Sequence, residues 1–210
     1  MKYDVAVIHG RFQPLHIGHM EYLMAGVSRC NKLIVGITNP DPWQLGDEAS
    51  DPSRGSLEAN PCTFYERYLM VERSLIDSGV TLAQMRIVPF PHSYPERLMY
   101  YAPSDAVYLL SIYNEWGEVK LRRFQDLGLQ TEILWRRDET VTSGTEIRRR
   151  IRTGQAWTDL VPAATASVIR ECEIDRRIRE YSIDQSAGQP AHAEPGTTLD
   201  SHDSHREERP

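Results

Sequence analysis

The sequence lacks an apolar run of the roughly 18 or more residues needed to cross a membrane, and no secretory signal peptide is recognisable in it. Cysteine is scarce: the chain has three, Cys30, Cys62 and Cys172, and their scattered spacing is not that of metal ligands. We therefore expect reduced thiols, no membrane association and a cytoplasmic location.

A surplus of positive charge is also absent. The formal net charge is −6, and the segment from Asp184 onward supplies about −4 of it, with six acidic residues against two arginines. The rest of the chain is close to neutral, which argues against a general nucleic-acid-binding protein because such domains are usually basic. A hydrophobic content of 40% over 210 residues is enough for one well-buried α/β domain.

Short apolar runs and amphipathic segments alternate along the chain. Five runs are typical of buried strands, namely Tyr3–His9, Leu33–Ile37, Met85–Phe90, Ala106–Leu110 and Thr131–Trp135. Helical periodicity covers Gly18–Cys30, Tyr65–Asp77, Glu115–Asp126, Glu146–Thr153 and Ala163–Tyr181. This order predicts a Rossmann-like, doubly wound α/β fold, with a five-stranded parallel sheet, helices on both faces and ligands at the carboxyl ends of the strands.

Two polar segments interrupt or follow this alternation. Asn39–Pro61 is rich in Pro, Asp, Ser and Gly, and we favour a lid at the ligand-binding edge over a disordered loop. Ser182–Pro210 is poor in large apolar residues and predicts a disordered tail. The expected organisation is one catalytic domain over residues 1–181 and a polar tail over residues 182–210.

The clearest motif follows the first apolar run. Gly10 ends that run, and His16-Ile-Gly18-His19 opens the next helical segment. A helix N-terminus presents unpaired N–H groups and a positive dipole end, so it attracts anions. His16 and His19 lie on one face of the first turn, and Gly18 leaves the backbone accessible. The arrangement predicts a site that stabilises charge on phosphoryl oxygens.

A second helix start lies late in the chain. Ser143 and Glu146 have the spacing of a capping box, Gly144 and Thr145 lie between them, and Arg148 follows. Taken alone, this segment is as typical of an ordinary capped helix with a solvated basic face. Together with the first motif, it predicts that two helix ends and several arginines hold one triphosphate.

Read together, Gly10–His19 and Thr142–Arg148 resemble the two signatures of the H-x-G-H nucleotidyltransferase superfamily, in the right order and at the right ends of the chain. Residues 4 to about 180 resemble archaeal-type nicotinamide mononucleotide adenylyltransferase, with Tyr65-Glu66-Arg67 matching its G-E-R helix.

This resemblance implies roles for particular residues. The catalytic residues would be His16, His19 and Arg148, which with Arg11 neutralise the triphosphate, and Arg67 would bind the phosphoryl group of the acceptor. The nucleotide-binding residues would be Gly10, Arg11, Phe12, Gln13, Gly18, Trp135, Ser143, Gly144 and Thr145. Further acceptor-binding candidates are Asn39, Tyr94, Tyr113 and Trp116, although core packing explains the last two equally well.

Departures from the adenylyltransferase pattern cluster where the acceptor would lie. His92-Ser-Tyr94-Pro95 replaces a tryptophan that stacks on nicotinamide, and the S-G-N after the fourth strand is also absent. The segments Gly36–Asp41, Ala59–Pro61 and Ile112–Gly117 instead resemble cytidylyltransferases of phosphonate natural-product pathways, in particular the nucleotidyl domain of fosfomycin-type synthases. This implies transfer of CMP from CTP to a small phosphonate, such as a hydroxyalkyl phosphonate, with release of pyrophosphate.

The main alternative is nicotinamide mononucleotide adenylyltransferase, which makes NAD from ATP and the mononucleotide. A nucleotide sensor without catalysis is a second alternative. A class I aminoacyl-tRNA synthetase would also need a K-M-S-K-S-like partner motif and a basic face, which this sequence lacks. The expected cofactor is Mg²⁺ held mainly by the triphosphate and water. A homo-oligomer is compatible with the sequence.

Overall fold

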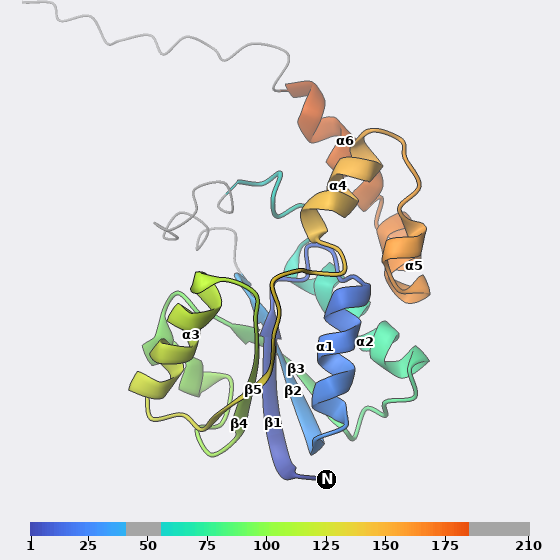
Figure 1. The fold of residues 1–210 in the computed structure, drawn as a ribbon. Helices are drawn as coiled ribbons and strands as arrows, with labels where there is room; N and C mark the ends of the chain where they lie inside the picture. Colours follow the sequence, from blue (N-terminus) through green and yellow to red (C-terminus); the bar gives the residue numbers. More distant parts are fainter. Residues whose placement is uncertain (41–55, 185–210) are drawn as a thin grey trace, which may run out of the picture.

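The computed structural model describes residues 1–40 and 56–184. Its centre is a five-stranded sheet in which every pair of neighbouring strands is parallel (Figure 1). The strands are β1 (Tyr3–Gly10), β2 (Cys30–Thr38), β3 (Met85–Phe90), β4 (Val107–Ile112) and β5 (Thr131–Arg136). Their order, β3-β2-β1-β4-β5, reverses direction between β1 and β4. The predicted doubly wound fold is confirmed.

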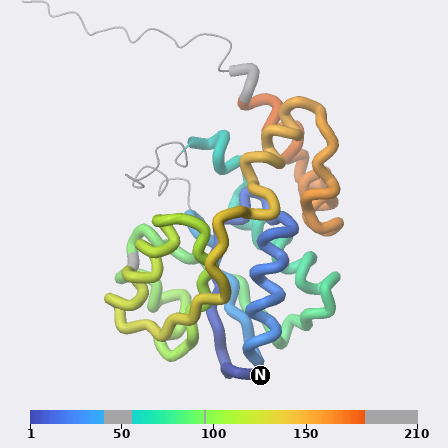
Figure 2. Tube along the Cα trace, in the orientation of Figure 1, coloured from blue at the N-terminus to red at the C-terminus, as the bar shows by residue number. Residues whose placement is uncertain are grey.

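Helices cover both faces of this sheet, as the sequence predicted. Figure 1 shows α1 and α2 on one side and α3 on the other, with the C-terminal helices beyond one end of the strands. The tube in Figure 2 shows the N-terminus at the opposite end of the sheet. The helices are α1 (Ile17–Val27), α2 (Phe64–Asp77), α3 (Glu115–Asp126), α4 (Gly144–Arg152), α5 (Ala163–Glu171) and α6 (Ile174–Asp184), with short 3-10 turns η3 (Pro95–Tyr100) and η4 (Thr158–Leu160).

Alternation along β1 divides the apolar interior into two layers. Ala6 and Ile8 belong to the cluster beneath α1 and α2, whereas Val7 belongs to the cluster beneath α3. Successive side chains of a strand point to opposite faces, so a buried parallel strand must be apolar on both. This is why the strands read as continuous apolar runs.

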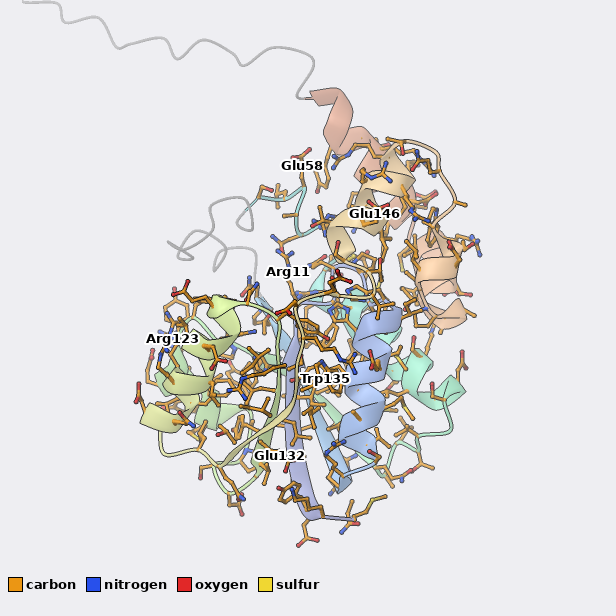
Figure 3. The ribbon with its side chains drawn as sticks, in the orientation of Figure 1. Arg11, Glu58, Arg123, Glu132, Trp135 and Glu146 are labelled. Carbon is orange, nitrogen blue, oxygen red and sulfur yellow. The ribbon has the colours of Figure 1, made fainter. Side chains whose placement is uncertain are left out.

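The register of the strands brings their carboxyl ends to one edge. Gly10 pairs with Ile37 in β2, and a register shift lies between Leu110 and Ser111 at the end of β4. The opposite edge is closed by an ionic cluster in which Glu132 pairs with Lys2 at 2.6 Å. Figure 3 shows Glu132 and Arg11 toward opposite ends of the sheet. The edge at the carboxyl ends of the strands is therefore separated from the Glu132–Lys2 cluster by the length of the sheet.

Two predicted helices have wrong boundaries, and the predicted strand Leu33–Ile37 begins three residues earlier, at Cys30. The first helix ends at Val27 rather than Cys30, because Cys30 already pairs with Tyr3 as the first residue of β2. The single helix expected over 163–181 is broken into α5 and α6, and Glu173 between them has a φ of 51°. A left-handed residue interrupts helical hydrogen bonding, and no glycine or proline announces this break.

Helix α6 is fastened to the start of α2. Thr63 caps α2, and Glu66 accepts from the Thr63 N–H while also pairing with Arg177 of α6 at 2.9 Å. The C-terminal helices are thus fixed against the body of the domain. The helix α6 extends to Asp184, three residues past the predicted domain end at 181. Most of the predicted lid and tail lies outside the described residues. In the described ranges, no helix is long and apolar enough to cross a membrane.

Candidate active site

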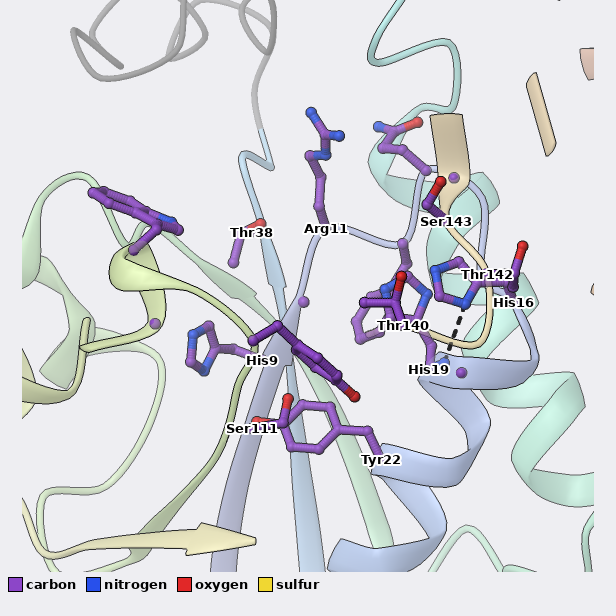
Figure 4. A pocket seen from close by; sticks show the side chains of 18 of the residues that line it. His9, Arg11, His16, His19, Tyr22, Thr38, Ser111, Thr140, Thr142 and Ser143 are labelled. Atoms are coloured by element: carbon purple, nitrogen blue, oxygen red, sulfur yellow. Dashed lines mark hydrogen bonds between the residues drawn. The ribbon is translucent and has the colours of Figure 1, made fainter. Parts of the chain in front are cut away.

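A cavity of about 330 Å³ opens at the carboxyl ends of β1, β2 and β4, next to the point where the strand order reverses (Figure 4). Sheets of this kind bind ligands at such a position. Twelve residues expected from the sequence line the cavity: Gly10, Arg11, Phe12, Gln13, His16, Gly18, His19, Asn39, Tyr113, Trp116, Ser143 and Gly144. Segments that are more than 100 residues apart in the chain therefore share one wall.

The two histidines of the first motif are stacked against each other at the start of α1. Their ring centroids are 3.6 Å apart, and His19 also meets the Phe12 ring edge-on at 4.9 Å. His16 is the N-cap residue, and its Nδ1 accepts a hydrogen bond from the His19 backbone N–H at 3.2 Å. An Nδ1 that accepts must be unprotonated, so the proton of the neutral ring is on Nε2.

Both imidazoles are neutral at physiological pH. Burial lowers the pKa of His16 to about 4. The pKa of His19 is well below its usual value, first because of burial and then because of repulsion from His16 and Arg11. We expected these rings to neutralise the triphosphate as cations. The lowered pKa values favour uncharged N–H donors in the free site, and Arg11 supplies positive charge in the wall of the cavity.

The second motif begins α4 and is joined directly to the first. Ser143 caps the helix and its Oγ accepts from the Glu146 N–H at 3.2 Å. The Glu146 carboxylate does not complete the predicted capping box, because it pairs with Arg149 and Arg150 at 2.8 Å. Gly144 lies so close to the carbonyl of Gln13 that a side chain there would overlap the Gln13 oxygen. The starts of α1 and α4 therefore converge on the same cavity, as predicted.

Arg148 links the two motifs and lies outside the cavity wall. Its Nη1 donates to the Gln13 carbonyl at 2.6 Å, and its Nη2 donates to Thr145 Oγ1 at 3.2 Å. Only 6% of the residue is exposed, and burial lowers the pKa of its guanidinium to about 10, which leaves it charged. Two of its donors are therefore directed at protein acceptors in this structure, and the expected direct contact of Arg148 and Thr145 with phosphate stays a prediction.

Arg67 also differs from its expected role. The residue is 2% exposed, and its guanidinium donates to the carbonyls of Arg11, Thr38 and Asn39 at 3.1, 2.7 and 2.8 Å. A further bond from Nε reaches the carbonyl of Thr63 at 3.1 Å. Arg67 thus holds the ends of β1 and β2 from beneath instead of facing an acceptor. Its expected contact with the phosphoryl group of the acceptor stays a prediction, which the Arg67 donors seen here do not support.

Two aromatic candidates lie outside the cavity wall as well. The Trp135 indole stacks with the guanidinium of Arg137 at 4.5 Å and donates from Nε1 to the Tyr113 hydroxyl at 2.9 Å. Trp135 therefore orients Tyr113, which does line the cavity. Tyr94 immediately precedes η3, and its ring faces the guanidinium of Arg97 at 4.9 Å. The sequence could not distinguish these supporting aromatics from lining ones.

The cavity also contains polar residues that sequence reasoning missed, chiefly His9, His92, Ser111 and Lys120. His9 is the last side chain of β1 before Gly10 and was read as part of an apolar run. A histidine in an otherwise apolar buried strand was the signal that was overlooked. Figure 4 shows His9 on the α3 side of the cavity and the His16–His19 pair on the α1 side.

The part of the cavity wall that the structure describes has cationic and neutral polar groups without acidic ones. No aspartate or glutamate lines the cavity among residues 1–40 and 56–184, and no cluster of three metal-ligating side chains occurs in those ranges. Carboxylate oxygens are the usual protein ligands of Mg²⁺. The described side chains therefore suit a polyanion and do not form a protein cage for a divalent cation.

Comparison with known proteins agrees with this geometry. Residues 7–150 match the cytidylyltransferase-like family, so the chain belongs to that family of nucleotidyltransferases. The chain is 61% identical over 173 residues to phosphonoformate cytidylyltransferase from Streptomyces viridochromogenes, a match that covers 82% of this chain and 94% of the relative. It is 27% identical over 171 residues to nicotinamide-nucleotide adenylyltransferase from Saccharolobus solfataricus, covering 81% of this chain and 92% of that protein.

Solved structures show the same fold. A bifunctional NMN adenylyltransferase/ADP ribose pyrophosphatase from Francisella tularensis superposes with a TM-score of 0.62 at 17% identity, covering 88% of this chain. This chain spans 56% of that bifunctional protein. A protein from Vibrio parahaemolyticus named "putative nicotinate-nucleotide adenylyltransferase" superposes with a TM-score of 0.56 at 14% identity. The match covers 84% of this chain and 96% of that one.

Proposed function

We propose that this protein transfers CMP from CTP to phosphonoformate or a closely similar small phosphonate and releases pyrophosphate. The observation that carries the proposal is the 61% identity to phosphonoformate cytidylyltransferase, which extends over 94% of that relative. The name of that relative favours a carboxylated phosphonate over the hydroxyalkyl phosphonate suggested by the sequence motifs. The anion-binding cavity between the starts of α1 and α4 fits such a reaction.

The chemistry requires little from a general base. A phosphonate oxygen of the acceptor attacks the α-phosphorus of CTP and forms a new P–O bond. The bond from the α-phosphorus to the bridging oxygen breaks, and pyrophosphate leaves with the electron pair. Phosphate monoesters have a second pKa near ~6, so an oxyanion of this kind is available at neutral pH. The protein must mainly bring two anions together in line and stabilise the charge that develops.

Particular groups of the cavity suit these tasks. The unpaired N–H groups at the starts of α1 and α4 would hold phosphate oxygens, with Arg11 and Ser143 beside them. The Nε2–H of His16 and an N–H of His19 would donate to oxygens of the reacting phosphoryl group. Neutral donors in a buried site can stabilise a developing oxyanion without the desolvation cost of added cations.

Mg²⁺ would enter as part of the substrate, bound to CTP phosphates and water. This follows from the chemistry of the described wall, which offers cations and amide or hydroxyl groups instead of carboxylates. The ion would offset charge on the triphosphate when bound. The residues described here would orient the complex.

A substrate matrix tests the proposal. Pyrophosphate release is measured for CTP and ATP, each with phosphonoformate and with nicotinamide mononucleotide, and the products are identified by ³¹P NMR. We expect turnover with CTP and phosphonoformate, seen as a new phosphoanhydride. Turnover only with ATP and the mononucleotide would instead assign the adenylyltransferase reaction named for the relatives at 27–28% identity. Tight CTP binding with no turnover for any pair would assign a nucleotide sensor.

A further inference from the structure

The α3 side of the cavity contains a group of polar residues for which the phosphoryl-transfer scheme has no use. We call His9, His92, Ser111 and Lys120 the His9 subsite; all four line the cavity. They come from the ends of β1 and β4, the segment after β3, and helix α3. The triphosphate motifs at the starts of α1 and α4 lie on the other side (Figure 4).

His9 is held rigidly at the base of this subsite. It is 7% exposed, its ring stacks on Phe90 at 5.0 Å, and it meets the edge of Phe124 at 5.2 Å. Gly36 of β2 pairs with His9 of β1 and makes room for this stack, because a Cβ at Gly36 would lie 2.5 Å from the Phe90 ring. The ring of His9 is therefore fixed by packing, with little freedom to turn toward another partner.

Neither ring nitrogen of His9 has a hydrogen-bond partner among the described residues. Buried polar groups without partners destabilise a fold, and in native proteins they often mark a site that a ligand completes. Burial, followed by the nearby charges of Lys120 and His92, lowers the pKa of His9 well below its usual value. At neutral pH the ring is uncharged and offers one N–H beside a cationic ammonium.

This group has the chemistry of a carboxylate receptor. An ammonium and a fixed N–H donor match the charge and lone pairs of a carboxylate, and no acidic residue occurs among the described residues of the wall. The acceptor in the proposed function carries two anionic groups. Its phosphonate must lie near the α1 and α4 side to reach the α-phosphorus. Its carboxylate then extends away from the triphosphate, toward the α3 side.

We propose that the His9 subsite binds the carboxylate of the acceptor, and that His9 and Lys120 select carboxylated phosphonates over simple alkyl phosphonates. The inference rests on the proposed function. It gives His9 a specificity role that no motif in the sequence announces. A hydrogen bond from a fixed donor to a charged group gives strong discrimination against an analogue that lacks that group.

The test compares two acceptors across three variants. Steady-state kcat/KM is measured with phosphonoformate and with methylphosphonate, which lacks the carboxylate, for the wild type, His9→Leu and Lys120→Met. Lys32→Met is the matched control, because Lys32 lies on β2 outside the cavity wall. We expect the preference for phosphonoformate to fall roughly ten- to a hundred-fold in His9→Leu and in Lys120→Met, and to stay unchanged in Lys32→Met.

Separate binding measurements distinguish the possible failures. Calorimetric titration gives the Kd of phosphonoformate and of CTP for each variant, and thermal melting shows that the variant is folded. A folded His9→Leu and a folded Lys120→Met that both keep the wild-type preference would overturn the inference. So would a loss of CTP binding with phosphonoformate binding intact, because the subsite would then hold the nucleotide. A wild type that binds phosphonoformate without turning it over refutes the proposed function, while the binding comparison still tests the subsite.

Discussion

Replacement of Gly144 by alanine tests whether the close approach of two motifs sets the geometry of the site. An alanine Cβ would overlap the Gln13 carbonyl oxygen and lie 3.1 Å from Arg148 Nη1. Real Cβ atoms essentially never come within 3.0 Å of such neighbours, so the starts of α1 and α4 would have to separate by more than about half an ångström. Misplacement of a catalytic group by about 1 Å costs roughly 10²-fold in rate. We expect kcat to fall by roughly ten-fold or more.

Gly144→Ala should change the free energy of unfolding only slightly, although it lowers kcat. Overpacking costs about 1–3 kcal/mol, but alanine is favoured over glycine in a helix by about 1 kcal/mol, so the two effects partly cancel. Gly128→Ala is the matched control. Gly128 has a φ of 71° and nothing within 4 Å of a Cβ, so alanine there is strained by about 1–2 kcal/mol without touching the cavity.

The assay is pyrophosphate release under saturating substrates, with urea unfolding to measure the free energy of both variants. We expect comparable losses of stability in the two proteins and a loss of kcat in Gly144→Ala alone. A Gly144→Ala protein whose kcat stays within two-fold of the wild type would refute the reasoning, because the distance between the motifs would then not limit the chemistry.

Three further predictions concern single side chains. His19→Ala should lower kcat by roughly 10²–10³, the loss expected for one oxyanion donor; near-full turnover would remove His19 from the mechanism. NMR titration of the free protein should show His16 uncharged between roughly pH 6 and 8, because a pKa lowered to about 4 allows protonation only in acid; a midpoint near 6.5 would contradict the burial argument. Arg67→Met should lower the free energy of unfolding by roughly 3 kcal/mol, because three buried carbonyls at the cavity edge lose their donor. If stability is kept and only the acceptor KM rises, Arg67 contacts the acceptor after all.

The fold and the phosphate side of the cavity could be predicted because both depend on local rules. Apolar runs specify buried strands, and Ser143 and the H-x-G-H tetrapeptide each precede a helical segment and so mark a helix start. Two such starts in one chain with alternating elements must meet at the carboxyl edge of a parallel sheet. The structure places both at one cavity.

The roles of the arginines could not be predicted in the same way. A guanidinium has five donors, and it satisfies them with phosphate oxygens or main-chain carbonyls equally well. Arg67 and Arg148 use theirs on the carbonyls of loops that are distant in sequence, such as Gln13 for Arg148. Only the three-dimensional path of those loops decides between the two roles. His9 was missed for a related reason, since its surroundings come from β3 and α3.

The bond from Arg148 to Gln13 has a consequence for the order in which the protein becomes functional. Translation proceeds from the N-terminus, and all five strands are synthesised before α4. A nascent chain that ends after β5 can pair its strands but cannot clamp the loop after β1, because its clamp has not yet been made. Competence for catalysis is thus acquired late, and activity reports that α4 has docked.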